Sequence, residues 1–166
     1  MPFQHTTMRM KLGYSIYGLE GGHSMITAQN ILEIKGKDIW TVTPEDTVYD
    51  ALRLMARVDV GALMVTEGEH LVGIISERDY ARKVILLGKT SKETLVKEIM
   101  TKKVISIHPM QTCEECMDIM TKNKIRHLPV MMNGKLLGVV SIGDVVKNII
   151  YKQREKIKDL SIGKVV

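Results

Sequence analysis

The sequence is poor in aromatic residues and cysteine and has no long apolar run. One Phe, one Trp and five Tyr occur in 166 residues, so a hydrophobic core must be built mainly from Val, Ile, Leu and Met. Two cysteines cannot provide a disulfide framework, which favours a reducing compartment. No apolar run approaches the roughly 20 residues that a membrane-spanning helix needs, so no membrane segment is expected. The apolar content of 45% suffices for one globular domain or two small domains that share a core.

Charge of one sign is in modest excess. The formal net charge is +5, which suits an anionic ligand, but the basic residues are spread along the chain instead of forming one patch. Nucleic-acid binding through the basic C-terminal segment, residues 151–166, is therefore kept as a less favoured alternative and would show a steep salt dependence.

The chain contains an internal duplication. The segment Gly138–Asp144 repeats Gly73–Asp79 at a distance of 65 residues, and both read Gly, two apolar residues, Ser, two variable residues and Asp. The same offset without a gap pairs Glu33 with Glu98, Ile34 with Ile99, Lys37 with Lys102, Pro44 with Pro109, and Thr47 with Thr112. Two copies are too few for a solenoid, so a tandem pair that shares one core is expected.

Each copy predicts a leading helix followed by the order β-α-β-β-α. In the first copy, Thr47 is a plausible N-cap with Asp50 three residues later. In the second copy, Asn133-Gly134 between two apolar runs is a strong hairpin signal. The expected elements of the first copy are a helix at 26–34, a strand at 39–43, a helix from 48, strands at 60–66 and 71–76 around a Glu67-Gly68 turn, and a helix from Asp79 to about 87. Those of the second copy are a helix at 95–100, a strand at 104–107, a helix at 112–123, strands at 127–132 and 135–141, and a helix from about Asp144.

These elements divide the chain into an extension (1–24), two repeats (25–90 and 91–150) and a basic helical tail (151–166). The extension does not share the repeat, and its basic residues precede its first acid, a weak resemblance to an organelle transit peptide. An upstream extension, or a start at Met25, explains it equally well. A cytoplasmic location is expected, with organelle targeting by residues 1–24 as the alternative.

The repeated motifs resemble a known family. Pro-x-x-Thr before the first helix, His127-Leu128-Pro129-Val130 in a strand, and Gly-x-x-Ser-x-x-Asp at the last strand–helix junction are similar to a CBS-domain pair, also called a Bateman module. The resemblance covers about residues 31–150 and is closest to the stand-alone two-repeat subfamily. It implies an α+β fold in which two repeats pack sheet to sheet with pseudo-twofold symmetry, and two such chains that form a homodimer.

The resemblance also implies two clefts for adenosine-containing ligands. AMP, ADP or ATP are the leading candidates, with NAD and S-adenosylmethionine as further ones. In the family the adenine packs between apolar strand residues and is read by backbone groups. By position the first cleft would have Ile39, Gly61, Ala62, Leu63 and Ile74, and the second Val104, Leu128, Pro129 and Val139. Met64 stands where the second copy has Pro129, a departure that affects the adenine contacts of the first cleft.

The chemistry of the junction residues fits such a ligand. A carboxylate accepts both hydroxyls of a ribose diol, so Asp79 and Asp144 are the expected ribose contacts, with Ser76 and Ser141 beside them. The alternative is that each Asp only caps its helix. Phosphates require cations or free N–H groups. Those near the first cleft are Arg78, Arg82 and Lys83, and those near the second are Arg126, His127 and Lys147, with Arg82 and Lys147 the most solvated.

Catalysis has little support in the sequence. Cys113 and Cys116 form a C-x-x-C pair that could act as a dithiol, but Cys116 aligns with Ala51 on a buried helix face. Zinc would need a second ligand pair, and none exists, so no metal site is expected. No nucleophile with a base in reach and no phosphate-loop glycine motif is present. A dithiol oxidoreductase and a weak nucleotide hydrolase remain the enzymatic alternatives to a non-catalytic regulatory module in signal transduction that acts on an unidentified protein.

Overall fold

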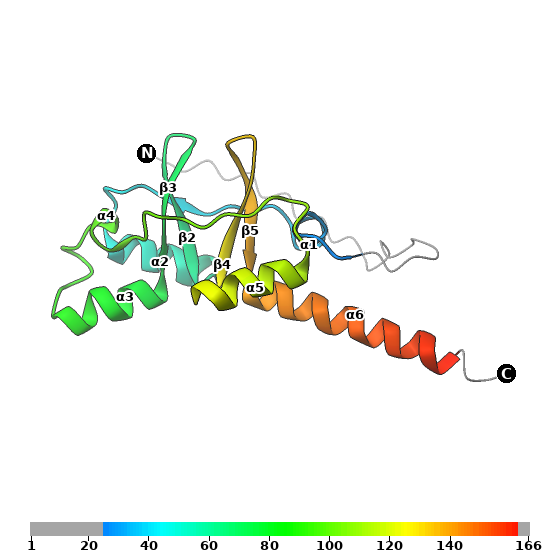
Figure 1. Cartoon of the computed structure of the whole chain (residues 1–166). Coiled ribbons are helices and arrows are strands. Elements are labelled where there is room, and N and C mark those ends of the chain that lie inside the picture. The colour runs from blue at the N-terminus through cyan, green and yellow to red at the C-terminus, as the bar shows by residue number, and fades with distance from the viewer. Residues whose placement is uncertain (1–24, 163–166) are drawn as a thin grey trace.

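The structure of the chain is a computed structural model that describes residues 25–162, with only the backbone described at 159, 161 and 162 (Figure 1). Its elements are α1 (Ala28–Lys35), β1 (Thr41–Val42), α2 (Val48–Val58), β2 (Ala62–Glu67), β3 (His70–Ser76), α3 (Glu77–Lys83), the 3-10 helix η1 (Ile85–Leu87), α4 (Val96–Ile99), α5 (Cys113–Asn123), β4 (His127–Met132), β5 (Lys135–Ser141) and α6 (Ile142–Ile162).

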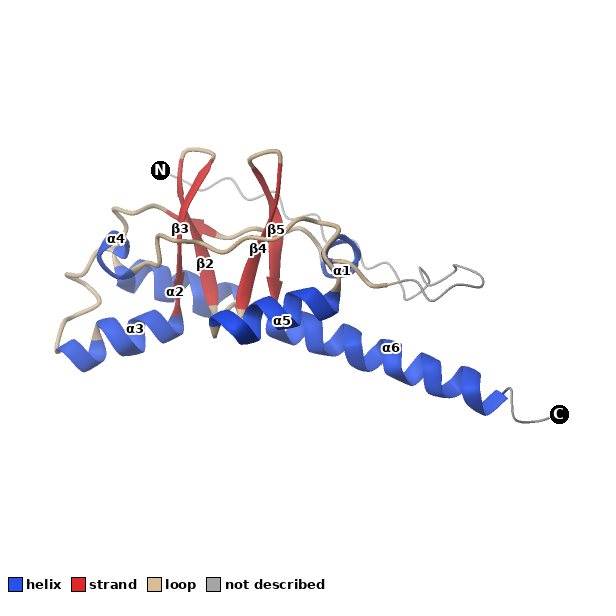
Figure 2. Ribbon diagram, in the orientation of Figure 1, coloured by secondary structure: helices blue, strands red, loops and turns tan. Residues whose placement is uncertain are grey.

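Two antiparallel hairpins stand side by side, with α2, α3, α5 and α6 toward one end of them (Figure 2). The first sheet has the order β1-β2-β3, with β1 parallel to β2, and the second consists of β4 and β5. Both hairpins shift register at the same place, after Val65 and after Val130. Both helices α2 and α5 end at a left-handed residue, Asp59 and Lys124. The predicted α+β fold of two tandem repeats is therefore confirmed.

The two hydrophobic cores exchange their leading helices. The core of β2, β3 and α2 contains Val96 and Ile99 of α4, although α4 belongs to the second repeat in sequence. The core of β4, β5 and α5 contains Ile31 and Leu32 of α1. Figure 1 shows α1 beside β5 and α4 beside α2 and β3. The sequence boundary near residue 90 therefore does not separate the two cores, and neither repeat completes its core alone.

Backbone hydrogen bonds fix this exchange in the same way twice. In the first repeat, Val48 donates its N–H to the Thr94 carbonyl at 2.9 Å, and Val96 donates to Asp46 at 2.9 Å. The corresponding bonds of the second repeat run from Cys113 to Ile26 at 2.9 Å and from Ala28 to Gln111 at 2.8 Å. Because all four connect a leading segment to the loop and helix start of the other repeat, the exchange is built into the backbone.

The leading segments follow an offset of 68 residues, not 65. Ala28 corresponds to Val96 in the bonds above, and Leu32 corresponds to Met100, because each lies against the equivalent glycine of a β-hairpin, Gly138 or Gly73. The predicted pairing of Ile34 with Ile99 is therefore wrong. Ile34 is 46% exposed whereas Ile99 is 2% exposed. The true counterpart of Ile99 is Ile31, which is 1% exposed.

Most element predictions are confirmed within one or two residues, including both hairpins and the N-cap Thr47. Four differ. The first strand is limited to β1, and the strand predicted at 104–107 is reduced to a single parallel bridge between Ile107 and Val130. The first hairpin turn is shifted by one residue, since β2 ends at Glu67. Helix α3 begins at Glu77 and ends at Lys83, where η1 follows. Helix α6 begins at Ile142.

From Ile142 to Ile162 the chain is one helix. α6 continues without a break from the second core into the predicted tail and runs beyond the body of the molecule (Figure 1). Across residues 25–162, no helix combines the length and apolar character that crossing a bilayer requires.

Candidate functional site

Both strand–helix junctions form the same capping box. Ser76 is the N-cap of α3, and Oδ2 of Asp79 accepts hydrogen bonds from the Ser76 N–H at 3.0 Å and the Ser76 hydroxyl at 2.7 Å. Asp144 Oδ2 accepts the same two bonds from Ser141, both at 2.8 Å. The helix-capping alternative is thus realised at both sites, and it uses only one oxygen of each carboxylate.

The two carboxylates have different cationic partners. Lys83 lies 2.8 Å from Oδ1 of Asp79 and also donates to the Ile99 carbonyl at 2.6 Å. Asp144 is bound instead by Lys35, whose Nζ lies 2.7 Å from Oδ2, the same oxygen that Ser141 uses. Burial raises the pKa of the Asp144 carboxyl, but the Lys35 ammonium and the Ser141 donors outweigh burial and hold this pKa below its ordinary value.

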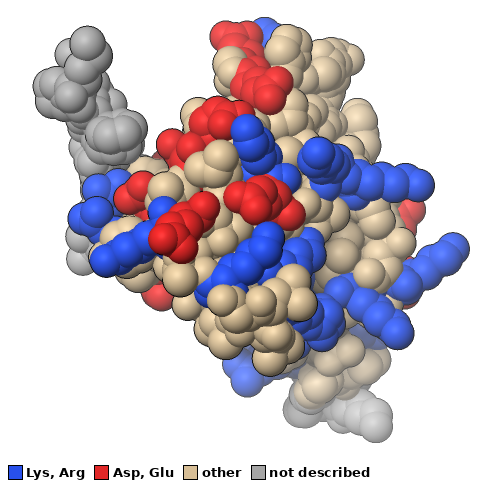
Figure 3. Space-filling view, turned by 90° about the vertical axis from the view of Figure 1, so that its left-hand side faces the viewer, with Lys and Arg blue, Asp and Glu red and all other residues tan. Residues whose placement is uncertain are grey.

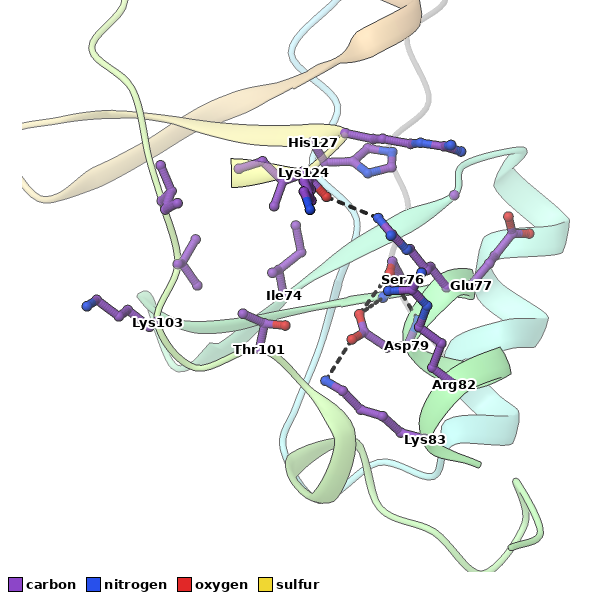
Figure 4. A pocket seen from close by; sticks show the side chains of 16 residues that line it. Ile74, Ser76, Glu77, Asp79, Arg82, Lys83, Thr101, Lys103, Lys124 and His127 are labelled. Atoms are coloured by element: carbon purple, nitrogen blue, oxygen red, sulfur yellow. Dashed lines mark hydrogen bonds and ion pairs between the residues drawn. The ribbon is translucent and has the colours of Figure 1, made fainter. Parts of the chain in front are cut away.

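A cavity of about 480 Å³ lies at the Asp79 junction (Figure 4). It lies between β3 and α3 of one repeat and two segments of the other, residues 101–105 and 124–127. Nine of the predicted site residues line it: Gly61, Ile74, Ser76, Arg78, Asp79, Lys83, Val104, Arg126 and His127. The cavity is of a size that small-molecule ligands occupy in proteins.

The cavity regroups residues that were predicted to lie in different clefts. Val104, Arg126 and His127 were assigned to the second cleft, yet they line the cavity of Asp79. The exchange of leading helices explains this correction. Because α4 packs in the first core, the segment that follows it, residues 101–105, passes the β3–α3 junction, where Thr101 forms an antiparallel bridge with Ile74.

The other predicted residues do not line the cavity. The side chains of Leu63 and Leu128 are 0% exposed and belong to the two cores, so only their backbone groups could face an adenine. Their predicted contact with the adenine stays a prediction. Ala62 and Pro129 are also buried. Ile39 and Val139 are half-buried outside the cavity, and Ser141 and Asp144 form the second junction.

Seven lining residues were not among the predicted site residues: Glu77, Arg82, Thr101, Lys103, Ile105, Lys124 and Ile125. Arg82 had been read as a solvated charge, and it is exposed, yet it borders the cavity beside Asp79 (Figure 4). Lys103 follows the exchanged helix α4, so the uniform offset of 65 residues did not predict that it lies at the cavity.

Basic side chains dominate the cavity wall. Six Lys or Arg residues line it, against two acidic residues, Glu77 and Asp79. Arg78 also joins the two repeats, because its Nη1 donates to the Lys124 carbonyl at 3.0 Å. Figure 3, which views the molecule from the end that carries α3 and α4, shows Lys and Arg side chains gathered in the middle of that face with acidic side chains among them. The wall is therefore suited to an anion.

His127 lies between the two junctions. It lines the cavity, and burial, followed by the nearby charge of Lys35, lowers the pKa of its imidazole despite the opposing effect of Asp144. Figure 4 shows the ring on the β4 side of the cavity, near Lys124. A neutral imidazole at this position can both donate and accept a hydrogen bond.

We expect His127 to make the fold less stable as the pH falls below 6.5, the ordinary pKa of the group. The unfolded chain then binds a proton that the folded chain resists, so unfolding is favoured until the pH passes the lower folded pKa. Urea unfolding between pH 7.5 and 5 should show this slope, and His127→Gln should flatten it. An unchanged slope in the variant would contradict the effect of burial on this imidazole.

The two cysteines are buried and unbridged. Both lie in the core of the second repeat, and burial raises the pKa of Cys113 to about 12 and of Cys116 to about 11. Burial therefore outweighs the favourable position of Cys113 at the start of α5, and the structure gives the dithiol hypothesis no support. Within residues 25–162, no group of His, Cys, Asp and Glu side chains could hold a metal ion.

Comparisons with known proteins agree with the architecture. The family model described as "CBS domain" matches residues 30–85 and 96–151. The chain is 41% identical over 152 residues to "CBS domain-containing protein CBSX3, mitochondrial" of Arabidopsis thaliana, covering 86% of this chain and 73% of that protein. A CBS-domain protein from Burkholderia ambifaria MC40-6 has a solved structure with a TM-score of 0.74 and 52% identity, covering 76% of this chain and 96% of that one.

A more distant structure shares the fold. It is a CBS domain pair solved in complex with 5'-methylthioadenosine and S-adenosyl-L-methionine, with a TM-score of 0.69 and 24% identity over 78% of this chain and 99% of that one.

Proposed function

We propose that this chain, which belongs to the CBS-domain family, is a non-catalytic regulatory module that binds an adenosine nucleotide in the cavity of Asp79. AMP, ADP and ATP are the leading ligands, and NAD and S-adenosylmethionine are the alternatives. Binding then changes the arrangement of the two repeats, and a partner protein responds to that change.

The observation that carries the proposal is that both repeats build the cavity. Asp79 and the start of α3 come from one repeat, while residues 101–105 and 124–127 come from the other. A ligand there contacts both halves at once, so its binding free energy can favour one arrangement of the halves over another. A cavity within a single repeat would lack this property.

The chemistry of the carboxylate supports a ribose contact. Oδ2 of Asp79 is engaged by the helix cap, whereas Oδ1 is held only by Lys83 on the helix surface. A ribose diol would compete with Lys83 for Oδ1 and leave the cap intact. The displaced ammonium would then be free to face a phosphate in the same cavity.

Asp79→Ala should reduce by about half or more the thermal stabilisation that an adenosine nucleotide gives the wild type. Stabilisation reaches about 2.7 kcal/mol at a hundredfold excess over Kd, and the loss of a charged contact should weaken binding by about tenfold or more. Differential scanning fluorimetry with each candidate ligand, with and without magnesium, measures the shift. ATP should stay unhydrolysed throughout.

Asp144→Ala is the matched control, because it removes the equivalent capping box. Both variants should lose about 1 kcal/mol of stability, while only Asp79→Ala should have a reduced ligand response. No response of the wild type to any adenosine compound would refute the proposed function. A response that Asp144→Ala alone abolishes would place the ligand in the other cleft.

We further propose that two chains form a homodimer. Helix α6 carries Ile142, Val146 and Ile150, each at least 36% exposed and spaced by one helical turn, an apolar stripe that a second chain would cover. Sedimentation should show a dimer, and Val146→Glu should shift it to the monomer. A wild-type monomer at micromolar concentration would refute this pairing.

The location of the protein stays a prediction. The transit-peptide interpretation falls on residues 1–24, which lie outside the described residues. The Arabidopsis relative is mitochondrial by name and matches 86% of this chain, which supports testing mitochondrial import beside the cytoplasmic expectation, with a fluorescent fusion of the full chain.

A further inference from the structure

The two junctions of the duplicated fold differ in charge, although their capping boxes are the same. We infer that the chain binds a single polyphosphate ligand, in the cavity of Asp79, and that the cleft of Asp144 does not hold a polyanion. The inference rests on the proposed function and deepens it, because it names the ligand class and the number of sites per chain.

The residue that meets the carboxylate is the first difference. Lys83 on α3 pairs with Asp79, and its counterpart 65 residues later is Asn148, a buried amide that donates to the Asp144 carbonyl at 2.8 Å. Helix α6 therefore supplies no ammonium to Asp144. The charge of that carboxylate is balanced by Lys35, the last residue of α1.

Lys35 has a counterpart with another role. With the offset of 68 residues that holds for the leading segments, it corresponds to Lys103, which lines the cavity of Asp79. Because Lys83 already balances Asp79, Lys103 is a surplus positive charge in that cavity. At the Asp144 junction the equivalent lysine, Lys35, is already paired with the carboxylate, with its Nζ 2.7 Å from Oδ2 of Asp144.

The ends of the matched helices also differ in charge. Lys124 lines the cavity at the left-handed end of α5, with φ 55°, and the same position of α2, with φ 56°, is held by Asp59. Arg78 of the cavity is replaced by Gly143 in the first turn of α6. The difference between Lys124 and Asp59 reverses a charge, and the difference between Arg78 and Gly143 removes one.

The remaining cations of the cavity can be compared in the same way. Arg126 of the cavity corresponds to Gly61, since each carbonyl accepts the first N–H of the following helix, from Ile142 and Glu77 respectively. Arg82 and Lys103 have basic counterparts, Lys147 and Lys35. Around Asp144 the equivalent positions hold four cations (Lys35, Lys37, Arg126 and Lys147) and three acids (Glu33, Asp59 and Asp144), an excess of one, whereas the six cations and two acids of the Asp79 cavity leave an excess of four. Phosphate groups bind where cations are in excess, so a polyphosphate selects the first cleft.

Calorimetric titration of the full chain with ATP, and with adenosine as the uncharged probe, tests the inference. One ATP per chain is expected. Raising NaCl from 50 to 500 mM should weaken ATP by about tenfold or more and leave adenosine nearly unchanged, because salt screens charged contacts. Two equivalent ATP sites per wild-type chain, or equal salt dependence of the two probes, would overturn it.

A graft of cations supplies the converse test. Asp59→Lys with Gly143→Arg places the residues of the first cleft in the second, and both are compatible with the backbone. Lys124 already adopts the conformation of Asp59, and a side chain at Gly143 would meet only the Ser141 hydroxyl, at 3.7 Å. The double variant should bind two ATP per chain, and adding Asp144→Ala should restore one.

The outcomes separate the two proposals. A folded double variant, verified by circular dichroism, that still binds one ATP would overturn the role of charge, while the proposed function would stand. If the wild type binds adenosine as tightly as ATP, the role of charge would likewise be overturned while the proposed function would stand. If neither probe binds the wild type, the proposed function fails and this inference fails with it.

Discussion

Replacing Ile99 by Ala should destabilise the fold by about 2–5 kcal/mol, the range for truncating a fully buried aliphatic side chain. Ile99 is 2% exposed and lies in the core formed by β2, β3 and α2, although it belongs to the short helix α4 of the other repeat. A loss of this size would remove a large fraction of the stability of a domain of this length. Urea unfolding of the two proteins measures it.

The control is Ile34→Ala, the residue that a uniform offset of 65 would make equivalent. Ile34 is 46% exposed at the end of α1, so its truncation should change stability by about 0.5 kcal/mol or less. Ile31→Ala, at the position that the structure makes equivalent, should match Ile99→Ala in cost. Equal losses for Ile34→Ala and Ile99→Ala would contradict the register of the leading helices.

The features that the sequence predicted well are local ones. The N-cap Thr47 bonds within three positions of itself, and the Asn133-Gly134 turn has both φ angles positive, as its residue types favour. Alternating apolar runs between turn signals placed both hairpins within a residue or two. Each of these depends on neighbours in the chain, so the sequence contains the information directly.

The exchange of leading helices could not be predicted from such local signals in the sequence. The apolar residues of α1 and α4 predict that each helix is buried, but a helix of four to eight residues fits either of two similar cores. Contacts across about 80 residues decide the question, such as the bond from Ala28 to Gln111. The three-residue shift of register was hidden for a related reason, since chance identities such as Glu33 with Glu98 favoured the uniform offset.

The same long-range contacts account for the errors in the site. Asp79 and its neighbours in α3 were predicted because the motif is contiguous. Lys103 and Lys124 were missed, and His127 was assigned to the other cleft, because their place in the cavity depends on how one repeat lies against the other. The sequence indicates part of the charge contrast between the clefts, since Arg78 corresponds to Gly143, and Lys103 and Lys124 enlarge it.

That contrast leads to the second large effect, a charge reversal on two matched helices. Arg82→Glu should weaken ATP binding by about tenfold or more, since a charge-assisted hydrogen bond contributes about 1.5–3 kcal/mol and the new carboxylate also repels phosphate. Arg82 lines the cavity one turn beyond Arg78, on the exposed side of α3. Its exposure makes a loss of folding stability small, so the change should act on binding alone.

Lys147→Glu is the matched variant, since Lys147 holds the equivalent place on α6, is also exposed, and does not line the cavity. Calorimetry with ATP should give it the wild-type Kd within about twofold, because a charge on the far cleft is screened beyond roughly one Debye length. Because both variants change the net charge by the same amount, a difference between their ATP affinities reports the position of the charge. Equal weakening by both would mean that ATP responds only to the overall charge of the protein, and that its phosphates do not face α3.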